Sequence, residues 1–387
     1  MRVAAKMNRL GTETAFEMLA RARALEAKGR HIVHLEIGEP DFDTPANIVE
    51  AAVTALRQGW THYGPSAGLP ELRETIAREA TEVRGVPFTA DQVVVTPGAK
   101  PIMFFVIMAL VDEGDEVIYP NPGFPIYESM INFVGGVPVP IQLREDREFR
   151  FDVAELVAKV NDKTRLIILN SPQNPTGGVL TRADLEEVAR VAIERDIPVL
   201  TDEVYRRIIY QGEHFSIASV PGMQDKAIIL DGFSKTYAMT GWRLGYGILP
   251  HDLAPHITRL MTNSASCTAS FIQKAGVEAI TGPQDEPARY VAEFKRRRDV
   301  IVDGLNAIPG FSCLRPQGAF YVFPNTSRTG MTSSALADFL LNEAGVATLS
   351  GGSFGQYGEG YLRLSYANSV ENLKLALERI KAAVAKL

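Results

Sequence analysis

The sequence predicts an α/β fold with a mainly parallel sheet between helices, plus a smaller α+β part. Short runs of continuous apolar residues alternate with segments of helical periodicity, as is typical of strands buried on both faces of a parallel sheet. Past about residue 287 the pattern changes to a long charged helix followed by short strands and helices. The chain of 387 residues also exceeds the size, roughly 250 to 300 residues, at which one hydrophobic core stops growing.

Glycine and proline set the limits of the first elements. An amphipathic helix is expected at 14–28, closed by Gly29, and a strand at 31–37. A turn-rich stretch at 38–45 follows. Two further helices, each ended by a glycine, are expected at 47–58 and 71–84.

The large sheet is expected where the apolar runs recur. Its strands are predicted at 92–96, 116–119, 165–169, 198–201 and 227–230, and the helices between them at 100–112, 123–134 and 182–195. Thr181-Arg-Ala-Asp184 resembles a capping box at the start of the last helix. We therefore expect a large domain at 46–287.

The smaller domain is expected to combine residues 1–45 with 288–387. Its helices are predicted at 288–307, at 333–343 and from 369, and its strands near 311, at 319–323, near 346 and at 361–365. The alternation is too irregular for a second parallel sheet, which predicts an α+β arrangement.

Composition excludes several classes of function. The net charge is −6, and the longest basic block, Lys295-Arg-Arg-Arg298, lies in a helical pattern, so nothing indicates nucleic-acid binding. The longest apolar run, 101–111, is too short to span about 30 Å of hydrocarbon, and the N-terminus lacks a signal-peptide pattern. Two cysteines, Cys267 and Cys313, form no disulfide framework. We expect a cytoplasmic protein without a membrane anchor or a metal site.

The chain is organised around a loop that follows the apolar run 227–231. This loop carries the hydroxyl of Ser234, the amine of Lys235 and the guanidinium of Arg243. An amine beside a fixed guanidinium and partly shielded from water is more available in its neutral form, as a nucleophile towards a carbonyl. A Schiff base is one natural use; the alternative is an ordinary surface lysine.

Two more loops follow strands and carry unusual residues. The amides of Gly98, Ala99 and Lys100 open a helix, which makes a seat for a phosphate, although a simple glycine turn is the alternative. Phe124 stands between prolines in Asn121-Pro-Gly-Phe-Pro125, so its ring is held as a stacking platform unless it is a core residue.

The next two loops add polar groups. Asn174 lies in the stiff polar stretch 170–178, and Asp202 ends an apolar strand with Tyr205 just after it. Asp202 could cap a helix that starts there. If it faces a buried cation instead, an interaction across about 4 Å at an effective dielectric near 20 is worth roughly 4 kcal/mol, or about three pKa units. That would keep a heterocyclic nitrogen protonated.

Together these groups offer partners for a phosphate, an aromatic ring, a ring nitrogen, a phenolic oxygen and an aldehyde. Pyridoxal 5′-phosphate carries all of these features. Each signal alone is weak, but the set leaves few other ligands.

The chain resembles fold type I pyridoxal-phosphate enzymes, the class I/II aminotransferases of the aspartate-aminotransferase superfamily, over essentially its whole length. The resemblance rests on Gly38-Glu-Pro-Asp-Phe42, Tyr63-Gly-Pro-Ser-Ala-Gly-Leu-Pro-Glu-Leu-Arg73, Asn174-Pro-Thr-Gly177, Asp202-Glu-Val-Tyr205, Ser234-Lys-Thr-Tyr237, Gly241-Trp-Arg-Leu-Gly245 and Arg363-Leu-Ser365. It implies a seven-stranded, mainly parallel sheet and cis peptide bonds before Pro122 and Pro175.

The resemblance also implies roles for residues. Lys235, Asp202 and Tyr205 would be catalytic: Lys235 would bond to the cofactor aldehyde and move the substrate proton, and Asp202 would face the ring nitrogen. Tyr205 and Asn174 would bind the 3′ oxygen. The phosphate would be held by Gly98, Ala99, Lys100, Ser234, Arg243 and, from a second subunit, Tyr63. Arg363 would bind the substrate α-carboxylate, helped by Asn174 and Gly38.

In this family the reaction moves an amino group between an L-amino acid and a 2-oxo acid in two half-reactions. Aspartate or glutamate with 2-oxoglutarate is the leading expectation, because Lys100 stands where some members bind a distal carboxylate; it could equally be a surface lysine. The arm at 10–16 should border the pocket and could admit aromatic or aliphatic substrates, so an aromatic, alanine or broad-specificity aminotransferase is the alternative. Phe124 departs from the Trp or Tyr of many members, which could loosen cofactor stacking.

Two rival functions stay open at this point. β-Elimination or decarboxylation would use the same cofactor loops. A non-catalytic sensor domain would require an additional DNA-binding segment, for which this chain has no room. Tyr63 and the polar run 263–266 predict a homodimer with shared sites.

Overall fold

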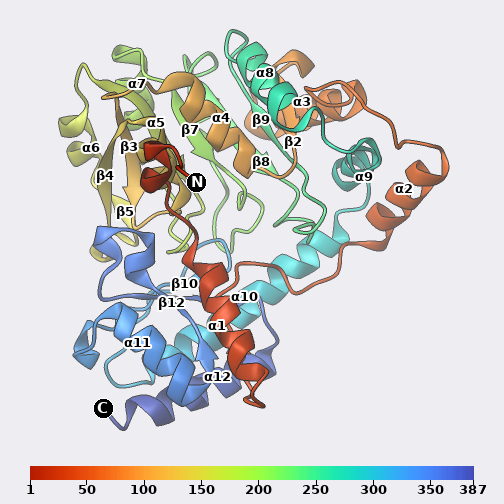
Figure 1. Ribbon diagram of the computed structural model, residues 1–387. Helices are drawn as coiled ribbons and strands as arrows, with labels where there is room; N and C mark the ends of the chain where they lie inside the picture. The colour runs from red at the N-terminus through yellow and green to blue at the C-terminus, as the bar shows by residue number, and fades with distance from the viewer.

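The computed structural model describes residues 1–387 as a large sheet with helices on both faces and a smaller C-terminal group of strands and helices (Figure 1). The large sheet has the strand order β2-β9-β8-β7-β6-β3-β4-β5. The strands are β2 Val93–Thr96, β3 Glu116–Asn121, β4 Val137–Arg144, β5 Arg150–Phe151, β6 Thr164–Asn170, β7 Val199–Asp202, β8 Ala227–Gly232 and β9 Gly245–Ile248. The two-residue strand β5 adds an eighth member at the edge of the expected seven.

The sheet is mainly parallel, as predicted. Strands β4, β3, β6, β7 and β8 pair in parallel, whereas β9 is antiparallel to β2 and β8, and β5 is antiparallel to β4. The sequence pattern did not predict β4 or β9. Prolines 138 and 140 in β4 and glycines 245 and 247 in β9 are residues that strands usually avoid.

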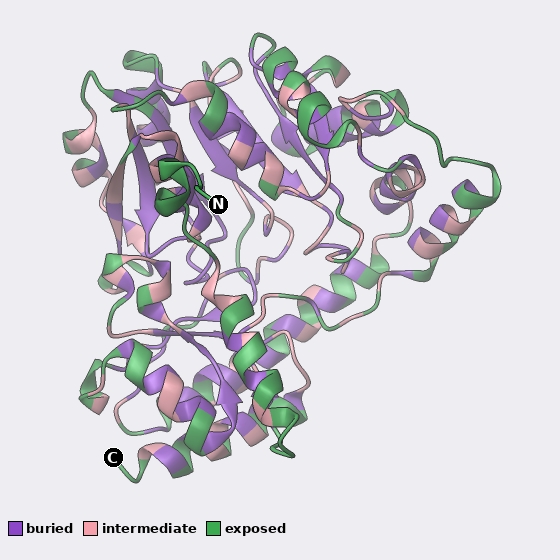
Figure 2. Ribbon diagram, in the orientation of Figure 1, coloured by how far each residue is buried: buried purple, intermediate pink, exposed green.

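Strand β6 shows why the central strands are apolar throughout. Leu166 and Ile168 pack in one buried cluster, and Ile167 and Leu169 in another, all at most 1% exposed. Successive side chains point to opposite faces, so a strand covered on both sides needs apolar residues at every position. Figure 2 shows the sheet buried beneath helices whose outer faces are exposed.

Helices cover the two faces in separate groups. One cluster includes residues of α4 Lys100–Leu110, α5 Ile126–Val134 and α8 Ala254–Ala265. The other includes residues of α2 Ala46–Arg57, α3 Pro70–Arg84, α6 Val153–Lys159, α7 Arg182–Glu194 and α9 Ser270–Thr281. Local signals agree with these bounds: Thr181 and Asp184 form the expected capping box of α7, and Gly85 ends α3 at φ 68°.

The C-terminal part contains a small antiparallel sheet in the order β10-β13-β12. Its elements are α10 Asp285–Asn306, β10 Tyr321–Val322, α11 Ser333–Phe339, a π-helical turn Leu340–Ala344, β12 Leu349–Ser350, β13 Leu362–Ser365 and α12 Val370–Val384. Helix α10 extends from the large sheet's helices to this part (Figure 1). The division at 46–287 stays a prediction.

The N-terminal arm contacts both parts of the molecule. Strand β1 Val33–His34 pairs with β11 Val346–Ala347, and α1 Thr14–Glu26 lies beside the C-terminal part (Figure 1). The first residues instead pack on α5: Gly11 N donates to Ser129 Oγ at 2.8 Å. Strand β1 is shorter than the expected 31–37, and the carbonyl of Glu36, two residues beyond it, accepts a hydrogen bond from Arg363.

Other predictions concern backbone geometry and the surface. The peptide bonds before Pro122 and Pro175 are cis, as predicted, and a third precedes Pro172. Neither Cys267 nor Cys313 is in a disulfide. None of the helices is both long and apolar enough to cross a membrane, and no group of three potential metal ligands occurs.

Candidate active site

A cavity of about 530 Å³ opens at the carboxyl ends of β6, β7 and β8. Asn170 and Asp202 end β6 and β7 and are paired in register, and Gly232 ends β8, so all three line the same edge. Every predicted site residue except Gly98 and Tyr63 lines this cavity. The predicted residues that line the cavity are Gly38, Ala99, Lys100, Phe124, Asn174, Asp202, Tyr205, Ser234, Lys235, Arg243 and Arg363.

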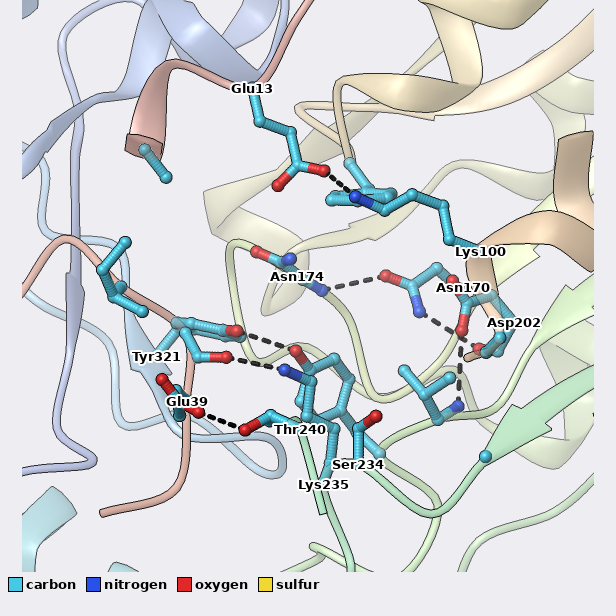
Figure 3. Close-up of a pocket in the computed structure, with 18 of the residues that line it drawn as sticks. Glu13, Glu39, Lys100, Asn170, Asn174, Asp202, Ser234, Lys235, Thr240 and Tyr321 are labelled. Carbon is cyan, nitrogen blue, oxygen red and sulfur yellow. Dashed lines mark hydrogen bonds and ion pairs between the residues drawn. The ribbon is translucent and has the colours of Figure 1, made fainter. Parts of the chain in front are cut away.

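Lys235 presents a partly buried amine to the cavity. Its Nζ donates a hydrogen bond of 2.6 Å to the carbonyl of Gly38 (Figure 3). Burial lowers the pKa of Lys235 to about 8, and the positive charges of Arg363 and Arg243 act in the same direction. The amine is therefore far easier to deprotonate than a lysine in water, which suits a nucleophile.

Asp202 is a buried carboxyl at the end of β7. It accepts hydrogen bonds from the hydroxyl of Tyr127 at 2.6 Å and from the N–H of Val204 at 3.3 Å. Burial raises the pKa of Asp202 to about 6, while the Tyr127 hydrogen bond opposes the shift. The helix expected to start here does not form: residues 204–207 make a turn, so Asp202 is not a helix cap.

The loop after β6 is fixed by Asn170. Its Oδ1 accepts from the N–H of Asn174 at 2.9 Å, and its Nδ2 donates to the carbonyl of Asp202 at 3.1 Å. These bonds tie the Asn174 loop to the neighbouring strand end (Figure 3). Asn170 thereby links the two predicted polar residues, Asn174 and Asp202, through hydrogen bonds to their main chains.

Arg363 brings a buried cation from β13 to the cavity. One nitrogen donates to Asn174 Oδ1 at 3.4 Å, another donates to the carbonyl of Glu36, and Nε has no hydrogen-bond partner. Burial lowers the pKa of Arg363. A buried guanidinium with no carboxylate partner and an unused donor is suited to an incoming carboxylate.

The start of α4 and Arg243 form one end of the site. Gly98 lies just before the helix at φ +83°, and a Cβ atom there would overlap the Arg243 guanidinium. This close approach requires glycine. The N–H groups at the start of α4 lie beside the Arg243 guanidinium, and Ser234 lines the same cavity. Together these groups are suited to binding an anion. Tyr63 is 89% exposed and lies outside the cavity lining.

Several cavity residues were missed by the sequence reasoning. Asn170 could have been found, because it ends an apolar strand just as Asp202 does. Tyr321, whose hydroxyl lies 2.7 Å from that of Tyr205, comes from the distant strand β10 and gave no local signal. Glu13 and Glu39 also line the cavity, as do Ala15 and Phe16 of the arm that was expected to border it.

Comparison with known proteins decides the family. Residues 30–380 match the family described as aminotransferase class I and II. The chain belongs to the class I and II aminotransferases. It is 42% identical over 356 residues to an aspartate aminotransferase of Pyrococcus abyssi, covering 91% of both chains.

Two further class I and II aminotransferases show the same likeness. An aromatic-amino-acid aminotransferase 2 of Thermococcus litoralis is 41% identical over 356 residues, covering 90% of this chain and 91% of that protein. The solved structure of an aspartate aminotransferase from Rhizobium meliloti is 36% identical, covers 100% of both chains and has a TM-score of 0.96. The fold is therefore fold type I, and the enzyme depends on pyridoxal phosphate.

The residues present fit this cofactor. A cofactor phosphate requires an anion site, which the start of α4, Ser234 and Arg243 can form; a ring nitrogen requires a buried carboxyl, which is Asp202. The aldehyde requires an accessible neutral amine, and burial of Lys235 favours one. The ring requires an aromatic neighbour, and Phe124 lines the same cavity.

Proposed function

We propose that this aminotransferase uses aspartate or glutamate as its leading amino donor and 2-oxoglutarate as acceptor, with Lys235 and Arg363 as the groups that bind cofactor and substrate. The observation that carries the proposal is that the partly buried amine of Lys235 and the buried guanidinium of Arg363, which has an unused donor, line one cavity. Bound pyridoxal phosphate supplies an aldehyde to carry the amino group and a ring that takes up electrons.

Each residue has a role that follows from its chemistry. The Lys235 amine would hold the cofactor through its aldehyde. Once the substrate amine has displaced it, the freed amine would take the proton from the substrate Cα as general base and return it as general acid. Asp202 would favour the protonated form of the ring nitrogen. Arg363 and Asn174 bind the α-carboxylate and so orient the Cα–H bond.

The remaining roles concern the cofactor. Phe124 would stack on the ring, and Tyr205, with Asn174, would bind the 3′ oxygen. The amides of Gly98, Ala99 and Lys100, the hydroxyl of Ser234 and the guanidinium of Arg243 would hold the phosphate, and in a homodimer the partner's Tyr63 would complete this phosphate site.

The choice of aspartate or glutamate as amino donor is supported by the names of relatives and by one residue of the cavity. Two of the relatives are named aspartate aminotransferase, and Lys100 lines the cavity as a possible partner of a distal carboxylate. An aromatic donor is the second candidate, favoured by the apolar side chains of Phe16, Met103 and Phe124 in the same cavity and by the Thermococcus litoralis relative.

Replacement of Lys235 tests the assignment of the amine. We expect Lys235→Ala to lower amino transfer from every donor at least about a thousandfold, because nucleophile and proton carrier are lost together. The visible absorbance of the bound cofactor should also change to that of the free aldehyde. Lys374→Ala, an exposed lysine on α12, is the control. Retained turnover in Lys235→Ala would refute the role.

A further inference from the structure

One cavity residue, Glu13, has no part in the roles above, although it is paired with Lys100, which has. The carboxylate of Glu13 forms an ion pair with the amine of Lys100, joining the residue before α1 to the first residue of α4. Glu13 stands at the N-cap position of α1 but makes no capping hydrogen bond, so its side chain is committed to the cavity. Its side chain is 19% exposed, against 42% for Lys100.

The pair lies at one end of the cavity. In Figure 3 the side chains of Glu13 and Lys100 point towards each other on the side of the cavity opposite Lys235. Asn174 lies between this pair and Lys235 in that view. The Lys100 amine also lies 5.4 Å from the centre of the Phe124 ring, which holds it at this end. Arg363, Lys235, Glu13 and Lys100 all line this one cavity, so the side chain of a substrate bound by Arg363 could reach the pair.

The Glu13 charge also reaches the groups proposed to bind substrate. It acts to raise the pKa of the buried cations of Lys235 and Arg363, although burial dominates both shifts. A carboxylate this close repels a second carboxylate bound in the same cavity. It also competes for Lys100, because a tethered group acts at high effective concentration.

We propose that Glu13 determines substrate specificity by occupying on Lys100 the position that a distal carboxylate of the substrate would take. The inference rests on the proposed amino-transfer function. While the pair is intact, this end of the cavity has no net charge and accepts uncharged side chains. A dicarboxylic substrate has to displace Glu13 to reach Lys100. One cavity can thus serve both donor classes, and Glu13 sets the balance between them.

The test compares Glu13→Gln with the wild-type holoenzyme. Gln keeps the size of the side chain and removes its charge. We expect the dissociation constant of succinate, measured by calorimetry, to fall about tenfold, and that of butyrate, which has one carboxylate, to change less than about twofold. The kcat/KM for aspartate should rise about tenfold, while that for alanine stays within about twofold. Glu17→Gln, the same change at an exposed position of α1 outside the cavity, is the control.

A second variant separates charge competition from a looser arm. In a Lys100→Gln background, Glu13→Gln should no longer strengthen succinate binding, because the cation for which both carboxylates compete is gone. The proposal is overturned if Glu13→Gln leaves succinate binding unchanged, improves succinate and butyrate equally, or gives the same gain without Lys100. If the holoenzyme transfers no amino group from any donor, the proposed function fails, whereas the succinate and butyrate comparison still decides the role of Glu13.

Discussion

At the scale of single residues, Asp202 is the group whose surroundings matter most. Its burial raises its pKa to about 6, so the carboxylate is costly to keep ionised unless a cation faces it. In the proposed function, the ring nitrogen of the cofactor would supply that cation. Coulomb attraction over about 4 Å at an effective dielectric near 20 is worth roughly 4 kcal/mol, which links the two charges strongly.

We therefore expect Asp202→Asn to slow exchange of the substrate Cα proton with solvent at least about a hundredfold, because the ring loses its charge. Cofactor binding should persist, since Asn can still accept the hydrogen bond from Tyr127. Proton exchange followed by NMR in deuterated water measures the effect. Asp196→Asn, at an exposed turn after α7, is the control. An unchanged exchange rate would mean that Asp202 only closes the turn at Val204.

At the scale of elements, the junction of β2 and α4 is the proposed phosphate end of the site. Gly98→Ala should weaken cofactor binding at least about tenfold, since the new methyl group displaces the Arg243 guanidinium. Gly114→Ala is a matched control: its φ is +90°, but no atom lies within 4 Å of the added carbon. Both variants should lose about 1 kcal/mol of stability from backbone strain. Titration of each apoenzyme variant with cofactor should therefore give a weaker affinity for Gly98→Ala than for Gly114→Ala. Equal affinities of the two variants would exclude the proposed phosphate site.

Some elements of the fold could be predicted from sequence patterns, and others could not. Strands such as β6 were predictable because burial on both faces requires an unbroken apolar run. Strand β9 was not, because its glycines are there for close packing: a Cβ at Gly245 would overlap the backbone of Ala99. The helix expected after Asp202 does not form; in its place is a turn whose Arg206 and Arg207 both pair with Glu79, a contact from a distant helix that no local pattern shows.

At the scale of the whole molecule, the cavity depends on contacts that no local pattern encodes. Arg363 and Tyr321 come from the C-terminal part, and Glu13 from the arm, to meet loops of the large sheet. That the loops of the large sheet meet at one site was predictable, because the carboxyl ends of parallel strands lie at the same edge of a sheet. The ion pair of Glu13 with Lys100 was not, because it joins residues 87 positions apart through tertiary packing alone.

The quaternary prediction rests on Tyr63, a large side chain that is 89% exposed although it stands in a stretch typical of the family. Isolated exposure of this kind is common, so the test must show that Tyr63 acts in a second subunit. A heterodimer of Lys235→Ala and Tyr63→Ala chains, purified through two tags, has one site with Lys235 and with the partner's Tyr63. Its activity per intact lysine should equal that of wild type.

The matched control carries the same two substitutions on one chain, paired with a wild-type chain. Its only site with Lys235 then lacks the partner's Tyr63, and its activity should fall about tenfold through weaker phosphate binding. The two heterodimers differ solely in how the substitutions are distributed, so folding defects affect both equally. If they have the same activity, Tyr63 contributes to no site. If the first heterodimer is the less active of the two, Tyr63 serves its own subunit. Either result shows that the shared-site homodimer is wrong.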